Sequence, residues 1–220
     1  VLLTACHALD DLTFQTRTLT AGGAEANFDA YAGATVEPRR IPIVDVIALD
    51  PRLDLALLRI DPQTAGQIAD NDSLPAITAP SALALTTGAP VCVIGFPLAA
   101  DQALQSLIRL LMPENLGNKR AALGEVIDQD GPLFHHDCTT LAGNSGSPVL
   151  GINSGQLLGV HVAGHVWVRN RAVGGSELTD FLSKGLDRQR STNRKSGVSS
   201  MAQRREQFQQ TVQWPARLRT

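Results

Sequence analysis

The chain has little cysteine, few aromatic residues and no long apolar run. Only three of its 220 residues are cysteines (Cys6, Cys92 and Cys138), and 4% are aromatic. Three thiols do not make a disulfide framework, so buried free thiols are the simpler interpretation. No apolar run approaches the ~18 residues of a membrane-spanning helix, and we expect no membrane association. A hydrophobic content of 43% is nevertheless enough for a sizeable core at this length.

A recognisable metal-binding pattern is also missing. Cys6 and His7 are adjacent, and His135, His136 and Cys138 lie close together further along the chain. Their spacing matches none of the usual zinc-ligand patterns. We therefore expect neither a metal nor a cofactor.

The net charge of −2 is small but unevenly distributed. Residues 183–220 hold nine Lys/Arg against two Asp/Glu, and residues 1–182 hold the other ten against nineteen. Because charge runs are usually solvated surfaces, we expect no nucleic-acid partner. Asp187–Ser200 reads as a polar linker. Met201–Gln213 has the spacing of an isolated amphipathic helix, which would need a fused or partner domain to be stable.

Short strands dominate the predicted secondary structure. Several runs of strand-forming residues bounded by turn formers favour an all-β barrel or sandwich. Leucine spacing predicts a short helix over Ala103–Leu111, and Ser176–Lys184 is expected to form a closing helix. Val1–Leu3 reads as a strand leading into His7. The other expected strands are Leu12–Thr18, Ile41–Leu49, Leu55–Ile60, Val91–Phe96, Leu123–Asp128, Pro148–Ile152 and Leu157–Ala163.

The most informative segment is Gly-Asn-Ser-Gly-Ser-Pro at residues 143–148. By itself it is equally consistent with an ordinary polar turn. Two upstream residues raise its value, because His7 follows an apolar strand and Asp54 begins another. The gaps are 47 residues from His7 to Asp54 and 91 from Asp54 to Ser145. The serine-protease template of the chymotrypsin type has the same order, with gaps of about 45 and about 93.

The chemistry of peptide hydrolysis requires these residue types. The Ser145 hydroxyl is a weak nucleophile until a base removes its proton, and His7 is the candidate base. Asp54 would hold the tautomer of His7 and stabilise the imidazolium that forms. The backbone N–H groups of Gly143 and Ser145 would form the oxyanion hole.

Further segments extend the resemblance. They are Lys119-Arg120, Gly124–Val126, His136–Thr140, Gly159–His161 and Asn170–Val173. With the serine loop, they make residues 1–182 resemble the bacterial trypsin-like peptidases related to glutamyl endopeptidases.

This resemblance implies a serine endopeptidase that cleaves protein or peptide substrates through an acyl-enzyme. It implies two β-barrels of the chymotrypsin-like type, with the active site in the cleft between them and a short C-terminal helix and tail. We expect a peptidase domain at residues 1–186, with barrels at about 1–80 and 90–175, and a basic linker with a helix at 187–220. The competing hypothesis is a catalytically silent protease fold that acts as a protein-binding module.

Residues near the serine bear on specificity and activation. Asn144 stands where digestive trypsins carry the aspartate that pairs with a new N-terminus, so that switch is not expected here. Thr139, six positions before Ser145, replaces the trypsin aspartate that binds Lys or Arg. The resemblance to glutamyl endopeptidases implies that Thr140 and His161 bind a substrate carboxylate, which favours Glu before the scissile bond. A structural role for His161 remains an equal alternative.

The first barrel is expected to be incomplete. In the resembling family, other strands precede the one that delivers His7, whereas here the sequence opens on it. We expect an open sheet edge beside this strand, a complete second barrel from about Pro90 to Val173, and low solubility and weak activity of the isolated 220-residue chain.

Overall fold

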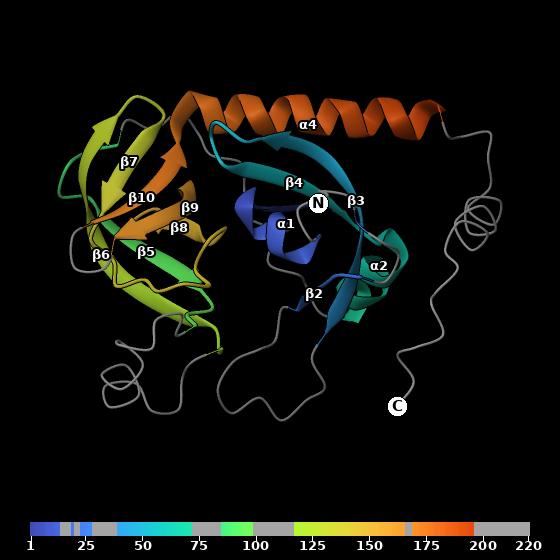
Figure 1. Ribbon diagram of the computed structural model, residues 1–220, viewed down its shortest axis with the longest axis horizontal. Coiled ribbons are helices and arrows are strands. Elements are labelled where there is room, and N and C mark those ends of the chain that lie inside the picture. The colour runs from blue at the N-terminus through green and yellow to red at the C-terminus, as the bar shows by residue number, and fades with distance from the viewer. Residues whose placement is uncertain are drawn as a thin grey trace.

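The described residues form an open β-sheet with two short helices, a closed β-barrel, and one long helix that begins at the barrel and runs along the sheet (Figure 1). This computed structural model describes residues 1–13, 19, 23–27, 39–71, 85–98, 117–165 and 169–195. The architecture is that of the chymotrypsin-like class, with one of its two barrels represented by an open sheet.

The N-terminal half is an antiparallel four-stranded sheet in the order β1-β4-β3-β2. Strand β1 forms one edge of the described sheet, so the expected open edge beside the strand that leads to His7 is confirmed. The strands are β1 (Leu2–Ala5), β2 (Glu25–Asn27), β3 (Arg40–Asp50) and β4 (Leu55–Ile60), and two helices accompany them, α1 (His7–Leu12) and α2 (Pro62–Asn71).

The C-terminal half is a closed barrel in the order β10-β7-β6-β5-β8-β9. The expected complete second barrel is therefore confirmed. Its strands are β5 (Pro90–Gly95), β6 (Arg120–Asp130), β7 (Leu133–His136), β8 (Pro148–Gly151), β9 (Leu157–His165) and β10 (Arg169–Gly174).

Two local predictions need correction. Leu12–Thr18 was expected to be a strand, but Leu12 ends helix α1, and Thr13 follows it with its N–H and hydroxyl both bonded to the Leu9 carbonyl. Helix forms here because Leu9, fully buried, packs into the core of the first sheet. Residues 14–18 of this expected strand lie outside the described residues. The closing helix expected at Ser176–Lys184 is α4, Gly175–Lys195, so the first part of the expected linker is helical.

The helices expected at Ala103–Leu111 and Met201–Gln213 lie outside the described residues.

One hydrophobic core joins the two halves and α4. The sheet contributes three of its buried residues, the barrel four and the helix two: Ala48, Leu55 and Leu57; Leu157, Val160, Val162 and Val173; Leu178 and Phe181. Gly185 lets α4 approach closely, since a Cβ there would lie 2.5 Å from Leu57 Cδ2. Burying each large side chain contributes roughly 1.5–3 kcal/mol, so this core fixes the sheet relative to the barrel.

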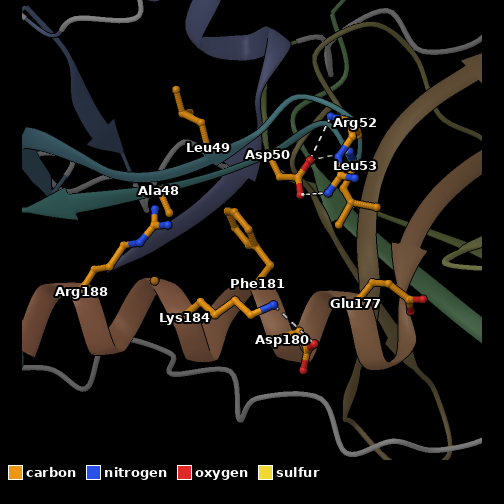
Figure 2. A pocket seen from close by; sticks show the side chains of 11 residues that line it. Ala48, Leu49, Asp50, Arg52, Leu53, Glu177, Asp180, Phe181, Lys184 and Arg188 are labelled. Atoms are coloured by element: carbon orange, nitrogen blue, oxygen red, sulfur yellow. Dashed lines mark hydrogen bonds and ion pairs between the residues drawn. The ribbon is translucent and has the colours of Figure 1, made fainter.

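A shallow pocket of about 230 Å³ lies between α4 and the turn that joins β3 to β4 (Figure 2). Asp50 organises this turn, because its carboxylate accepts hydrogen bonds from the backbone N–H groups of Arg52 and Leu53 at 3.0 and 3.3 Å. The charged side chains that line the pocket are paired in part with one another, as Arg52 is with Asp50 and Lys184 with Asp180. The turn leads directly into Asp54.

Gly146 forms a second connection between the halves. It has a φ of +85°, and a Cβ added to it would lie 2.2 Å from Thr4 Oγ1 and 3.0 Å from the Ala5 nitrogen. The loop after β7 can therefore touch strand β1 only because this residue lacks a side chain.

We expect Gly146→Ala to destabilise the protein more than Gly155→Ala. Gly155 also has a positive φ, +65°, but a Cβ there would meet no atom within 4 Å. Both variants force alanine into the left-handed region, at about 1–2 kcal/mol, and Gly146→Ala adds a steric cost of about 1–3 kcal/mol. Urea unfolding of both variants measures the difference. Equal losses of unfolding free energy would contradict the close contact.

Candidate active site

Ser145 lies on a tight loop between β7 and β8 that is held by its own polar groups. Asn144, 5% exposed, donates to the Leu141 carbonyl through its backbone N–H at 3.1 Å and its side-chain amide at 3.0 Å. The Ser147 N–H then bonds to the Asn144 carbonyl at 3.0 Å. Asn144 is thus satisfied by a neutral partner within the loop, so the loop conformation does not depend on a charge supplied from elsewhere.

His7 and Asp54 come together because strands β1 and β4 are paired. Ala5 lies opposite Leu55 in this pairing, which places the next residues along β1 beside the start of β4. The Cys6 N–H bonds to the Asp54 carbonyl at 2.9 Å. The carboxylate of Asp54 accepts from the His7 backbone N–H at 2.9 Å and lies 2.6 Å from His7 Nδ1.

The backbone of Asp54 is in the left-handed region, with φ of +56°, and among the described non-glycine residues it is alone in this. Aspartate tolerates this conformation better than most residues. The Asp50 turn before it and the fully buried Leu55 after it hold the residue in place.

The structure brings the three predicted catalytic residues together. His7 Nε2 lies 2.7 Å from Ser145 Oγ, while His7 Nδ1 faces Asp54. The imidazole therefore joins a hydroxyl from the barrel loop to a carboxylate from the sheet. This arrangement permits proton transfer from Ser145 to His7 without any movement of the side chains.

The two expected oxyanion donors lie in the same loop. Gly143 has a φ of +93°, and a Cβ on it would lie 2.4 Å from the Phe96 carbonyl oxygen. Among the backbone hydrogen bonds of the described loops and turns, none has the N–H group of Gly143 or of Ser145 as its donor. Neither N–H group is therefore occupied by a backbone acceptor in this part of the chain.

Beside this loop lies a group of four residues, Thr140, Asn170, His136 and His161, that we call the polar cluster. His161 is next to the serine loop, since its carbonyl accepts from the Gly146 N–H at 2.8 Å. His136 Nε2 lies 3.2 Å from His161 Nδ1, and Thr140 Oγ1 lies 2.6 Å from Asn170 Oδ1. His136 and Asn170 are opposite each other on β7 and β10, so the two pairs are neighbours.

Two members of the polar cluster were not among the predicted site residues. His136 and Asn170 were noted only as parts of the segments that resemble bacterial trypsin-like peptidases, and neither was assigned a role. A usable signal was their position two residues away from fully buried apolar residues on the same strands, Phe134 and Ala172, which places them on the inward face of the barrel. Polar side chains at inward positions of a small barrel need specific partners.

Both histidines of the polar cluster are neutral at neutral pH. Burial lowers the pKa of His161 to about 3, and repulsion from His136 and His7 acts in the same direction. Burial also lowers the pKa of His136 to about 4, with His135 adding to the effect and Asp137 opposing it.

The hydrogen bonds then indicate the tautomers. His136 Nδ1 is buried and has no partner in the described structure. Because unpaired buried N–H groups are rarer than unpaired acceptors, we assign the proton of His136 to Nε2, from which it is donated to His161 Nδ1. His161 therefore carries its own proton on Nε2.

These pKa values predict a loss of stability in mild acid. Above the unfolded histidine pKa of 6.5, both states are neutral and the two residues contribute no pH dependence. As the pH falls below 6.5, the unfolded chain binds protons that the folded chain does not, at about 2 kcal/mol per histidine near pH 5. Urea unfolding at about pH 7 and pH 5 should show this loss.

The matched variants are His136→Leu and His135→Leu, on the same strand. Replacing His136 should remove about half of the acid-dependent loss, and more than replacing His135, whose ring lies beside the Asp128 carboxylate outside the polar cluster. Equal unfolding free energies of the native sequence at both pH values would contradict the two depressed pKa values.

Two other features are absent from the described residues. No group of three or more His, Cys, Asp or Glu side chains in this part of the chain is placed to hold a metal ion. Nor does any described helix combine the length and apolar character needed to cross a membrane.

Comparison with known proteins places the chain in a family. The profile of the Trypsin-like peptidase domain matches residues 1–160. Comparison with curated protein sequences gives no significant match.

Two solved structures share the fold. A Glu endopeptidase in complex with MPD is 17% identical with a TM-score of 0.57, covering 83% of this chain and 79% of that one. A serine-to-alanine mutant of Rv3671c from M. tuberculosis H37Rv, in an inactive form, is 20% identical with a TM-score of 0.51, covering 83% of this chain and 75% of that one. With the family profile spanning most of its length, the chain belongs to the trypsin-like peptidases and is a serine endopeptidase.

Proposed function

We propose that His7, Asp54 and Ser145 form the catalytic triad of this peptidase. The observation that carries the proposal is the position of the His7 ring, 2.6 Å from the Asp54 carboxylate on one side and 2.7 Å from Ser145 Oγ on the other. The carboxylate fixes the proton on Nδ1, so Nε2 is free to accept the serine proton.

The reaction follows from this geometry. Ser145 Oγ attacks the carbonyl carbon of the scissile bond as its proton passes to His7 Nε2. The N–H groups of Gly143 and Ser145 bind the oxyanion, and each such donor typically contributes about 3–4 kcal/mol to the transition state. His7 then protonates the leaving amine, and an acyl-enzyme remains on Ser145. A water molecule, activated by His7, hydrolyses this ester and regenerates the hydroxyl.

We expect Ser145→Ala to lower kcat for peptide hydrolysis by about 10⁴–10⁶, because the nucleophile is lost while the oxyanion donors remain. The control is Ser154→Ala, which removes a hydroxyl from the exposed turn between β8 and β9 and should retain native turnover. A fluorophosphonate probe followed by mass spectrometry should label Ser145 in the native chain and in the Ser154 variant. A chain that binds peptides but neither hydrolyses them nor reacts with the probe would instead be a silent protease fold.

We further propose that the enzyme favours Glu before the scissile bond. His161 supports this, because the Nε2–H of its neutral imidazole can donate to a carboxylate, and the Thr140 hydroxyl can do the same if it releases Asn170 Oδ1. His161 lies directly beside the serine loop, as substrate recognition next to the scissile bond requires. Thr139 and Thr140 carry no negative charge, so neither of them favours a basic side chain before the scissile bond.

A peptide library profiled at about pH 6–7.5 tests this preference. Among acidic, basic and large aromatic residues before the scissile bond, Glu should give a kcat/KM at least about tenfold above Lys, Arg and Phe. His161→Leu should reduce this selectivity, whereas His135→Leu, outside the polar cluster, should preserve it. A native profile led by basic or aromatic residues would refute the preference.

A further inference from the structure

The side chain of Asn170 has a fixed orientation. Its Nδ2 donates to the Cys138 carbonyl at 2.6 Å, and its Oδ1 lies 2.6 Å from Thr140 Oγ1. Rotating the amide would place its oxygen against a carbonyl oxygen, with no proton between them. The residue is 9% exposed, so water offers it little compensation. Oδ1 must therefore face Thr140.

This orientation decides what Thr140 offers to a substrate. A threonine hydroxyl has one proton and two lone pairs. The proton is donated to Asn170 Oδ1, which accepts but cannot donate. Towards a bound side chain, Thr140 Oγ1 therefore presents a lone pair, while the His161 tautomer presents an N–H at Nε2.

One donor and one acceptor match a primary amide. The carbonyl oxygen of a glutamine side chain accepts from His161, and its NH₂ group donates to Thr140. A glutamate carboxylate has acceptors only. It meets the Thr140 lone pair, or it draws the Thr140 proton away and leaves Asn170 Oδ1 buried without a donor.

We propose that Asn170 is a positioning residue that sets the Thr140 hydroxyl as an acceptor and so makes glutamine a substrate of this peptidase alongside glutamate. The proposal rests on the proposed function, since it concerns the same specificity site. Because His161 is neutral, a negatively charged side chain has no favourable charge–charge interaction with it.

Gly164, opposite Asn170 on β9, supports this role. A Cβ at position 164 would lie 2.3 Å from Asn170 Oδ1 and 3.4 Å from Thr140 Oγ1. The barrel wall thus leaves space for the hydrogen bond between these two side chains.

The experiment compares two peptides that differ only in Glu or Gln before the scissile bond. The ratio of their kcat/KM values is independent of the fraction of active enzyme, so a partly unfolded variant still gives a valid result. For the native chain, the Glu/Gln ratio should lie within about tenfold of one. Sites built to bind one polar group commonly reject its counterpart by about 10⁴ or more. A native ratio above about 10³ in favour of Glu would overturn the proposal.

Two variants at position 170 should affect the ratio differently. Asn170→Leu removes the acceptor and frees the Thr140 proton for a carboxylate, so the Glu/Gln ratio should rise about tenfold. Asn170→Asp keeps an acceptor for Thr140, but its second oxygen faces the Cys138 carbonyl, so the buried acid should bind a proton and donate it to that carbonyl. Its ratio should therefore stay within about threefold of the native value. A purely structural role predicts no such difference, and equal shifts in both variants, or none, would overturn the assignment.

Thr140 provides the matched controls. Thr140→Ser retains the hydroxyl and should keep the native ratio, whereas Thr140→Val should disfavour the Gln peptide about tenfold. Cleavage only after other residues would refute the specificity while leaving the serine endopeptidase intact. Absence of both cleavage and fluorophosphonate labelling of Ser145 would refute the proposed triad as well.

Discussion

The hydrophobic core shared by the sheet, the barrel and α4 is the constraint on which the site depends. Ser145 belongs to the barrel, whereas His7 and Asp54 belong to the sheet, yet His7 Nε2 and Ser145 Oγ are 2.7 Å apart. Leu55, next to Asp54, and Val160, next to His161, are both members of this core. Packing at interior density resists small displacements, and a shift of about 1 Å at a catalytic centre is costly. The shared core therefore sets the distances at the site.

Local backbone conformations and hydrogen bonds then orient the side chains of the proposed triad. Asp54 adopts a φ of +56° after the Asp50 turn, which aims both carboxylate oxygens at His7. Gly143 and Gly146 take positive φ values on either side of the serine. Asn144 closes the loop through neutral hydrogen bonds within it. The site is thus held in shape by packing and neutral polar contacts, and the strained positions lie where the chemistry requires exposed groups.

The sequence predicted those parts of the structure that depend on local pattern. Strand β4 was predicted with its observed limits, and the strands β3, β5, β6, β8 and β9 within a few residues. The order of His7, Asp54 and Ser145 was readable because each lies beside a strand or a glycine-rich turn. Strands β7 and β10 were missed, since His136 and Asn170 place polar groups where the alternation predicts apolar ones. The polar cluster was also hidden, because it depends on the register of Asn170 opposite His136, which no local pattern encodes.

The contrast between His7 and His161 shows how the proposed active site accommodates two histidines with different roles. His7 has 47% of its side chain exposed and an aspartate beside it, so it can become an imidazolium during the reaction. A permanent charge on His161 would oppose that change, because the two rings repel each other when charged. Burial keeps His161 neutral and removes this opposition. In the proposed specificity site, recognition beside the scissile bond therefore relies on the direction of hydrogen bonds and not on charge, and the position of the Thr140 proton becomes decisive.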